Sequence, residues 1–319
     1  MSFKIGRLKL EGNAVLAPMA GVTHAAFRLQ CKLHGAALVY SPLMDEDGVI
    51  QAFSRFNDFI ADERPLGGQI VGATPEKMAE AAKIIEPYVD LIDINFGCPD
   101  KDVIAKKGGV YNLKCPENIG KIIRTIKDAV NVPVTAKIRI GWDEKSINYL
   151  EVAKIVEDAG ADALSIHGRT KEQGYSGKAD WNAIKQVKEK ANIPIIGSGD
   201  VNSPEKVKEK LESGSCDAVM IGRAAMGNPF IFSQINNYLR NGSYEKVTPE
   251  EKLDGFIELM EIYKTHQRRF KLSEIRTHAL WFTKGVFGAS ELRQRLLKAE
   301  KEEDLKEILD TYLKNRVRI

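Results

Sequence analysis

Three side chains with reactive groups lie within or directly after short apolar runs, and their surroundings indicate a chemical site. Cys98 stands between Gly97 and Pro99 in the stretch DINFGCPDKDV, directly after the apolar run LIDIN. Lys137 lies inside VTAKIRI, and His167 ends the run ALSIH. A thiol on a turn stiffened by proline can be buried filler, a redox group, a nucleophile or a proton donor. The role of Cys98 among these four has to be inferred from the predicted strands and loops around it.

The composition describes a protein with a full hydrophobic core. Of the 319 residues, 43% are hydrophobic and 29% are charged, as in ordinary globular domains. The net charge of +3 does not indicate a nucleic-acid binder, so a local cluster would have to supply any attraction to RNA. The four cysteines are scattered without a C-x-x-C pair, so we expect neither a disulfide framework nor a metal site. No apolar run approaches the ~20 residues of a membrane span, and the N-terminus lacks a signal peptide's apolar core. We therefore expect a cytoplasmic protein without membrane contact.

Eight short apolar runs alternate with amphipathic helical patterns, which predicts a (β/α)8 TIM barrel. Two of the helices, over 74–85 and 203–213, open with Ser or Thr, then Pro, then Glu, a common helix start. The segments GADALSIHGR and GSCDAVMIGR resemble each other, and repetition of one such unit favours a barrel over a doubly wound open sheet. The predicted strands are 14–18, 36–41, 66–71, 91–95, 133–139, 162–167, 193–198 and 217–222.

After about residue 240 the strand pattern stops. Residues 241–249 read as a linker, and four helical patterns follow, at 248–270, 272–285, 288–300 and 302–315. The prediction is a barrel domain over 1–240 and a small helical bundle domain over 241–319.

Polar side chains are expected inside this barrel. Alternation sends every second strand residue inward, and the apolar face of 133–139 must meet the helices, so Lys137 and Arg139 point into the barrel. The same reasoning directs further side chains inward, namely Gln69, Asp93, Asn95, Thr135, Ser165 and His167. Each has an ordinary alternative, such as a satisfied core histidine. Because all of them would lie at the same open end of the barrel, they indicate a site at the carboxyl ends of the strands.

Two glycine-rich loops predict a phosphate-binding site. GSGDV (197–201) and GRAAMGNPF (222–230) follow the seventh and eighth strands, where barrels commonly bind phosphate. Glycines let backbone N–H groups approach a phosphate, and Arg223 adds a positive charge. In LAPMAGVTHAAFR (16–28), Pro18 precedes small residues against which a flat aromatic ring could lie, unless this is an ordinary loop.

Together these motifs resemble the tRNA-dihydrouridine synthases. The resemblance rests on LAPMAGVTHAAFR, DINFGCPDKDV, VTAKIRIGW, SIHGRTKEQGYSGKADW, IPIIGSGDV and IGRAAMGNPFIF, and continues in IRTHALWFTKGVFGASELRQRL. It implies an FMN-bearing barrel followed by a helical tRNA-binding domain. Such an enzyme reduces uridine in tRNA with electrons from NADPH, and NADH is not excluded as the reductant. We expect a monomer.

The resemblance also assigns roles to residues. Pro18, Met19 and Ala20 would line the flavin ring, Gln69 would bind its pyrimidine edge, and Lys137 would lie near N1 and O2, with His167 in contact. Ser198, which stands where the family usually has Asn, would hold the phosphate with Gly199, Asp200, Gly222 and Arg223. Asn95, Arg139 and Arg169 are the expected substrate-binding residues.

The same resemblance favours proton donation among the roles open to Cys98. Reduction of uracil needs a hydride from flavin N5 at C6 and a proton at C5, and a positioned acid supplies the proton.

The second candidate function is a small-molecule flavin dehydrogenase of the dihydroorotate dehydrogenase type, which would not need residues 245–319. A non-catalytic RNA-binding protein and an aldolase using Lys137 as a Schiff base are further alternatives.

A basic cluster in the helical region is the expected tRNA platform. The stretch KTHQRRFKLSEIRTH contains Lys264, Arg268, Arg269, Lys271 and Arg276 against one acid, Glu274. Cations at the barrel mouth would continue this track, namely Lys101, Lys106, Lys107, Arg169 and Lys171. The ordinary alternative is a solvated helix face.

Overall fold

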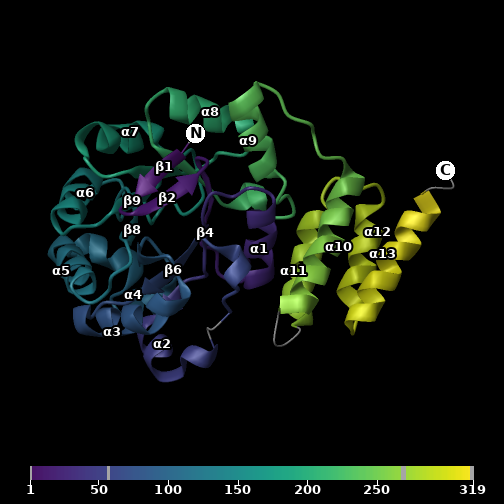
Figure 1. Ribbon diagram of the computed structural model, residues 1–319, viewed down its shortest axis with the longest axis horizontal. Helices are drawn as coiled ribbons and strands as arrows, with labels where there is room; N and C mark the ends of the chain where they lie inside the picture. The colour runs from purple at the N-terminus through teal and green to yellow at the C-terminus, as the bar shows by residue number, and fades with distance from the viewer. Residues whose placement is uncertain (1, 56–57, 267–270, 317–319) are drawn as a thin grey trace.

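A ring of parallel strands forms the centre of the molecule, with helices around it, in a computed structural model that describes residues 2–55, 58–266 and 271–316 (Figure 1). All eight predicted strands are confirmed. They are β3 (Ala14–Leu16), β4 (Val39–Tyr40), β6 (Leu66–Val71), β7 (Leu91–Phe96), β8 (Val134–Arg139), β9 (Ala163–His167), β10 (Ile195–Ser198) and β11 (Ala218–Ile221).

The strand order is β3-β11-β10-β9-β8-β7-β6-β4, and every pairing along it is parallel. The two ends of this path also meet, because Leu16 N donates to Leu38 O and Ala37 N donates to Ala14 O, both at 2.9 Å. The sheet therefore closes on itself, and all carboxyl ends of its strands face one mouth. The predicted TIM barrel is confirmed.

Two short additions escape the sequence patterns. Strand β5 (Met44–Asp45) pairs with the end of β6. An antiparallel hairpin, β1 (Ser2–Ile5) and β2 (Leu8–Glu11), packs Phe3, Ile5 and Leu10 against interior barrel residues such as Leu91 and Ile196. The hairpin closes the amino end of the barrel with apolar side chains, so polar chemistry is left to the opposite mouth.

Helices cover the outside of the ring. They are α1 (Ala25–Leu33), α2 (Glu46–Ala52), α3 (Pro75–Ile85), α4 (Lys101–Ala105), α5 (Pro116–Lys127), α6 (Tyr149–Asp158), α7 (Trp181–Lys190), α8 (Pro204–Glu212) and α9 (Ile231–Asn241). The start of α8 is as predicted, since the Ser203 side chain accepts from Lys206 N at its N-cap. No helix in the described part of the chain is long and apolar enough to cross a membrane.

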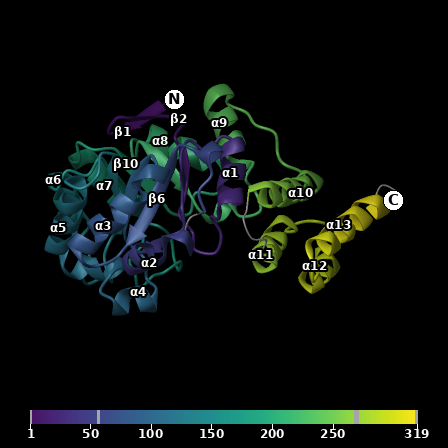
Figure 2. The same ribbon diagram turned by 60° about the horizontal axis from the view of Figure 1, so that its bottom comes forward.

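Four further helices form a unit beside α1, and Figures 1 and 2 show it on one side of the barrel, with α12 and α13 farthest out. They are α10 (Pro249–His266), α11 (Leu272–Phe282), α12 (Ala289–Lys298) and α13 (Glu302–Arg316). Helix α10 packs on α1, where Gln30 Nε2 donates to Gly255 O at 2.6 Å. Gly255 also lets α10 approach the Phe230 ring before α9, because a Cβ there would lie 2.8 Å from that ring. Residues 267–270, which include part of the predicted 248–270 helix, lie outside the described residues.

A pair of buried histidines joins the barrel to these helices. His24 is the N-cap residue of α1, where its Nδ1 accepts from Phe27 N at 3.4 Å. Its Nε2 lies 3.0 Å from Nε2 of His278 on α11, which also lies 3.3 Å from Val22 O. Two neutral rings cannot satisfy all three contacts, and Nδ1 of His278 is buried without a partner. While both rings are uncharged, one of these contacts lacks a hydrogen to form it, and the interface leaves a polar group unsatisfied.

Burial lowers the pKa of both rings. It lowers the pKa of His278 to about 4, and it lowers that of His24 well below its usual value, with His278, Arg28 and Lys271 adding repulsion. In the unfolded chain both rings take up a proton near pH 6.5. Between about pH 6.5 and pH 4 the unfolded state therefore binds more protons than the folded state, and stability falls as the pH falls.

We predict that His278→Phe removes part of this pH dependence. The variant will be less stable than the wild type near pH 7.5, because the contact with His24 is lost. Its midpoint of thermal unfolding will nevertheless fall less between pH 7.5 and pH 5 than the wild-type midpoint. His266→Gln, which removes an exposed histidine at the end of α10, is the control and should keep the wild-type slope. Parallel curves for His278→Phe and wild type would contradict the prediction.

Candidate active site

A ladder of polar side chains crosses the barrel interior, as the strand alternation predicts. Asp93 Oδ2 accepts from Gln69 Nε2 at 2.6 Å, and its Oδ1 accepts from Thr135 Oγ1 at 2.6 Å. Gln69 Oε1 in turn accepts from Asn95 Nδ2 at 2.8 Å. Burial raises the pKa of Asp93, while the Thr135 and Gln69 hydrogen bonds and the charge of Lys137 act in the opposite direction. The ladder fixes the orientation of Gln69 and Asn95 at the mouth.

Asn95 connects this ladder to the cysteine turn. Its Oδ1 accepts from the backbone N–H of Gly97 at 2.9 Å and of Cys98 at 2.7 Å. From the next strand, Arg139 Nε donates to Gly97 O at 3.0 Å. Gly109 closes the other side with a φ of +56°, and a Cβ there would lie 2.8 Å from Cys98 O. The second glycine in KKGGVYNLK is thus explained, because the returning chain must pass directly against the cysteine.

A large cavity of about 1010 Å³ opens at the same mouth. Nine of the predicted cofactor residues line it, namely Pro18, Met19, Lys137, His167, Ser198, Gly199, Asp200, Gly222 and Arg223. Ala20 is exposed and lies outside this lining, and Gln69 lies behind it in the ladder. The cavity lining thus unites residues from the ends of β3, β8, β9, β10 and β11. Their individual roles remain predictions.

An ion-pair network shapes the loop after β10. Arg169, only 1% exposed, donates from Nη2 to both Asp200 carboxylate oxygens at 2.7 and 2.8 Å. Arg223 lies 3.5 Å from the same carboxylate. Burial alone would raise the pKa of Asp200, but the hydrogen bonds from Arg169 and the Ala179 amide outweigh it and hold that pKa below its usual value. Gly199 has a φ of +130°, and a Cβ there would lie 2.5 Å from the Ala179 Cβ. A side chain at position 199 would therefore fill the edge of the cavity. Its absence leaves backbone N–H groups accessible there, as a phosphate-binding loop requires.

The predicted substrate arginines are engaged by the protein itself. Arg139 Nη1 donates to Thr170 O at 2.9 Å and to Gly174 O at 3.1 Å. Arg169 donates to Ser176 O and Gly177 O as well as to Asp200. Both arginines thus shape the loop after β9, and a direct contact with substrate remains a prediction for each.

Burial and the charges at the mouth shift the pKa of three groups. Burial and the surrounding cations Lys137, Arg139, Arg169 and Arg223 lower the pKa of His167 to about 2, so the ring is neutral. Burial and Arg139 lower the pKa of Lys137 to about 8, against the attraction of Asp93 and Cys98. Burial raises the pKa of Cys98, partly offset by the Asp100 amide, so the thiol keeps its proton near neutral pH.

Several residues at the cavity escaped the sequence reasoning. The ring of Tyr175, which is 64% exposed, lies 4.5 Å from the Arg223 guanidinium and 6.2 Å from His167. Lysines from three different segments add positive charge to the lining, namely Lys178, Lys206, Lys210 and Lys284. Lys284 belongs to the C-terminal helices, and no local pattern shows that it reaches the barrel mouth.

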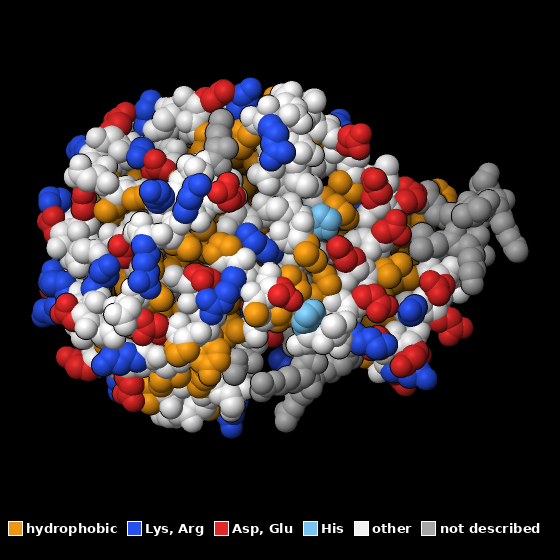
Figure 3. All heavy atoms as spheres, in the orientation of Figure 1, with side chains coloured by type: hydrophobic (Ala, Val, Ile, Leu, Met, Phe, Trp, Pro, Cys, Tyr) orange, Lys and Arg blue, Asp and Glu red, His pale blue; other side chains and the backbone are white. Residues whose placement is uncertain are grey.

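The basic cluster of the helical region is only partly described. Arg268 and Arg269 lie outside the described residues. Lys264 pairs with Glu302 at 3.4 Å and Lys271 with Glu274 at 3.1 Å, so neither charge is isolated. On the face shown in Figure 3, acidic side chains are frequent over α10–α13, whereas basic ones gather over the barrel.

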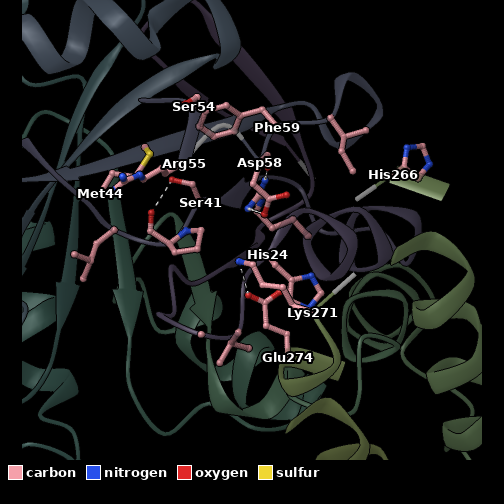
Figure 4. A pocket seen from close by; sticks show the side chains of 16 residues that line it. His24, Ser41, Met44, Ser54, Arg55, Asp58, Phe59, His266, Lys271 and Glu274 are labelled. Carbon is pink, nitrogen blue, oxygen red and sulfur yellow. Dashed lines mark hydrogen bonds and ion pairs between the residues drawn. The ribbon is translucent and has the colours of Figure 1, made fainter. Parts of the chain in front are cut away.

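A second cavity, of about 730 Å³, lies between the barrel mouth and the C-terminal helices (Figure 4). Its barrel side includes His24, Ser41 and Arg55, and its helical side includes His266 and Lys271. It follows the ends of β3 and β4, so a ligand held there would lie beside the mouth. The interdomain position was not predicted, because it depends on how α10 and α11 dock.

The fold and this mouth define a class, the (β/α)8 barrel enzymes that use polar groups at the carboxyl ends of the strands. A family model described as dihydrouridine synthase matches residues 15–317. The chain is 39% identical over 297 residues to tRNA-dihydrouridine synthase B of Vibrio vulnificus, covering 91% of this chain and 92% of the relative. It is 36% identical to tRNA-dihydrouridine synthase B of Vibrio cholerae, covering 98% and 99%. The chain belongs to the dihydrouridine synthase family.

Solved structures with little sequence similarity share the fold. Histamine dehydrogenase from Rhizobium sp. 4-9 aligns with a TM-score of 0.58 at 13% identity, over 81% of this chain and 50% of that one. Morphinone reductase aligns with a TM-score of 0.52 at 11% identity, over 79% and 93%. These similarities concern the barrel architecture.

The contacts of Arg139 generate a prediction about the thiol. Arg139→Lys keeps the charge but loses the planar fork that joins Gly97 to the loop after β9. We expect the cysteine turn to loosen and iodoacetamide to alkylate Cys98 severalfold faster at pH 8, measured by mass spectrometry of the Cys98 peptide. Arg124→Lys on the outside of α5 is the matched control and should alkylate at the wild-type rate. An unchanged rate in Arg139→Lys would show that this arginine does not restrain the turn.

Proposed function

We propose that the protein is an FMN-dependent tRNA-dihydrouridine synthase that reduces the C5–C6 bond of uridine in tRNA, with NADPH as the reductant. Membership of the dihydrouridine synthase family supports the reaction, and two relatives named tRNA-dihydrouridine synthase B match nearly the whole chain. The family model extends to residue 317 and so includes the helical region, which the small-molecule dehydrogenase alternative does not need. A tRNA substrate also favours a cytoplasmic location.

The 1010 Å³ cavity fits FMN by its chemistry. Gly199 leaves room for a phosphate, and Arg223 with the nearby lysines supplies positive charge. Pro18 and Met19 would hold the ring, and Lys137 and His167 would bind polar atoms of its edge. When bound, FMN supplies the hydride that adds to C6 of the uracil. Lys137 would favour negative charge on the nearby ligand atoms, and its depressed pKa of about 8 still leaves most of the side chain charged at neutral pH.

Cys98 carries the other half of the reaction, and its setting is the observation on which the proposal chiefly rests. The Asn95 and Arg139 hydrogen bonds hold its turn at the mouth, beside Lys137. Burial raises the pKa of Cys98, so the sulfur carries a proton to deliver. In the proposed step the S–H bond breaks, the proton forms the new C–H bond at C5, and the thiolate remains until it is reprotonated. The cations Lys137 and Arg139 stabilise that thiolate.

The interdomain cavity supports tRNA as the substrate. It lies beside the mouth, between barrel loops and the C-terminal helices, and Arg55, His266 and Lys271 line it (Figure 4). A uridine must leave its stack to reach the mouth, which costs a few kcal/mol, so contacts with the surrounding RNA must offset this cost.

Cys98→Ala tests the proposal. The variant should fold and bind FMN as the wild type does, and NADPH should still reduce the flavin. Turnover on tRNA that lacks dihydrouridine should fall by roughly 10²–10⁴-fold, the usual effect of losing a general acid. Dihydrouridine is measured by mass spectrometry of digested tRNA.

Cys115→Ala is the matched control, since Cys115 is the other half-exposed cysteine among the described residues and precedes α5. It should keep wild-type turnover. Wild-type turnover in Cys98→Ala would remove the proton-donor role, and a wild-type protein that binds FMN but leaves tRNA unchanged would refute the proposed function.

A further inference from the structure

Two lysines share one indole ring at the barrel mouth. Trp142 lies in the loop after β8. The Nζ atom of Lys114 lies 3.6 Å from the centroid of its ring, and the Nζ atom of Lys171 lies 4.6 Å from it. Lys114 ends the short helix η4 (Gly109–Lys114) that follows β7, and Lys171 follows β9. Three consecutive barrel strands therefore deliver these side chains to one place, here called the rim patch (Lys114, Trp142 and Lys171).

Backbone hydrogen bonds hold the three loops together. Lys171 N donates to Gly141 O and Glu172 N donates to Trp142 O, both at 3.0 Å. Asn148 Nδ2 donates to Leu113 O at 2.8 Å, which ties the loop after β8 to η4. The rim patch is thus part of a connected framework rather than a set of independent loops.

Within the rim patch two ammonium groups have one ion-pair partner, the carboxylate of Glu172. Two ammonium groups near one ring repel each other, and the indole face offsets only part of that repulsion. Lys171 pairs with Glu172 at 2.8 Å, but no carboxylate among the described residues forms an ion pair with Lys114. Helix α4 packs on η4 and adds Lys101 and Lys107, both exposed. An anion bridging Lys114 and Lys171 would relieve the repulsion.

The location distinguishes this charge from the other lysines of the surface. In the closed ring of eight strands β8 lies directly opposite β3, and the helix that follows β3, α1, packs on α10. The rim patch therefore faces the C-terminal helices across the mouth, and Figure 1 shows α5 and α6, which flank β8, on the side away from α10. Cys98, at the end of β7, lies on the same edge as the rim patch.

The cations predicted to continue the tRNA track along the mouth differ in burial and in pairing. Arg169 is buried against Asp200 and is committed within the protein. Lys106 and Lys171 each form an ion pair near the surface, with Asp45 at 3.0 Å and with Glu172 at 2.8 Å. Lys101 and Lys107 are exposed, and the structure adds the exposed Lys114, which the sequence reasoning did not select.

We propose that the rim patch is a second tRNA-binding surface, in which Lys114 and Lys171 hold a backbone phosphate and Trp142 packs against the adjoining sugar. It would grip the tRNA on the side of the mouth opposite the C-terminal helices. Contacts on both sides prevent the RNA from pivoting while one uridine occupies the mouth. This inference rests on the proposed function, because it assumes that tRNA is the substrate.

The test removes two charges from the rim patch in the full-length protein. Lys114→Ala with Lys171→Ala should weaken tRNA binding, measured by filter binding at several salt concentrations. If each lysine contacts one phosphate, the slope of log affinity against log salt should become less steep by about 1.4 to 1.8 in total. FMN content and NADPH oxidation without tRNA should stay at wild-type values.

Two further variants make the result specific. Lys83→Ala with Lys190→Ala removes the same charge from the last turns of α3 and α7, which lie at the amino end of the barrel, and should leave affinity and slope unchanged. Lys114→Arg with Lys171→Arg keeps both charges and should keep the slope.

Two results would overturn the inference. One is wild-type affinity and slope in the rim-patch double alanine variant, and the other is an equal loss in the control pair at the amino end. Failure of the proposed function would be seen separately, as a wild-type protein that neither binds nor reduces tRNA.

Discussion

The side chain of Asn95 is the constraint on which the candidate site depends. On one side it donates to Gln69, which belongs to the ladder through Asp93 and Thr135 inside the barrel. On the other side its oxygen accepts from the two amides that begin the cysteine turn. The position of the thiol is therefore fixed by hydrogen bonds that originate in the barrel interior. A buried polar chain of this kind is stable only when all its members are paired, which makes the mouth rigid as a unit.

Positive charge around the mouth sets the chemistry of the groups within it. Lys137, Arg139, Arg169 and Arg223 together favour a neutral His167, and Arg169 with Arg223 keeps Asp200 ionised. Cys98 responds mainly to burial and retains its proton. The same cations would favour negative charge that develops on a ligand or on the sulfur. Under the proposed function this one arrangement would bind an anionic cofactor, hold a proton on Cys98 and stabilise the thiolate after the proton leaves.

The C-terminal helices complete this arrangement in a different way. They dock on α1 through Gln30 and on its N-cap residue His24, and they contribute Lys284 to the barrel cavity. Their own surface mixes acidic and basic side chains, so they do not form a uniformly basic platform in the described residues (Figure 3). At the barrel rim Lys114 and Lys171 share the Trp142 ring. The proposed second tRNA-binding surface would therefore place contacts on both sides of the mouth.

The sequence by itself determined the eight barrel strands, the trailing helices and the inward direction of Lys137, Arg139 and the ladder residues. It could do so because strand alternation and glycine-rich turns are local and periodic signals. Only the tertiary structure decided that Arg139 and Arg169 are bound to loop carbonyls, that His24 meets His278, and that Lys114 and Lys171 share Trp142. Apart from the Ser176 and Gly177 carbonyls that Arg169 reaches, those partners lie tens to hundreds of residues apart, and their pairing depends on closure of the barrel and on how the helices dock. No local pattern encodes which side chains meet once the ring has closed.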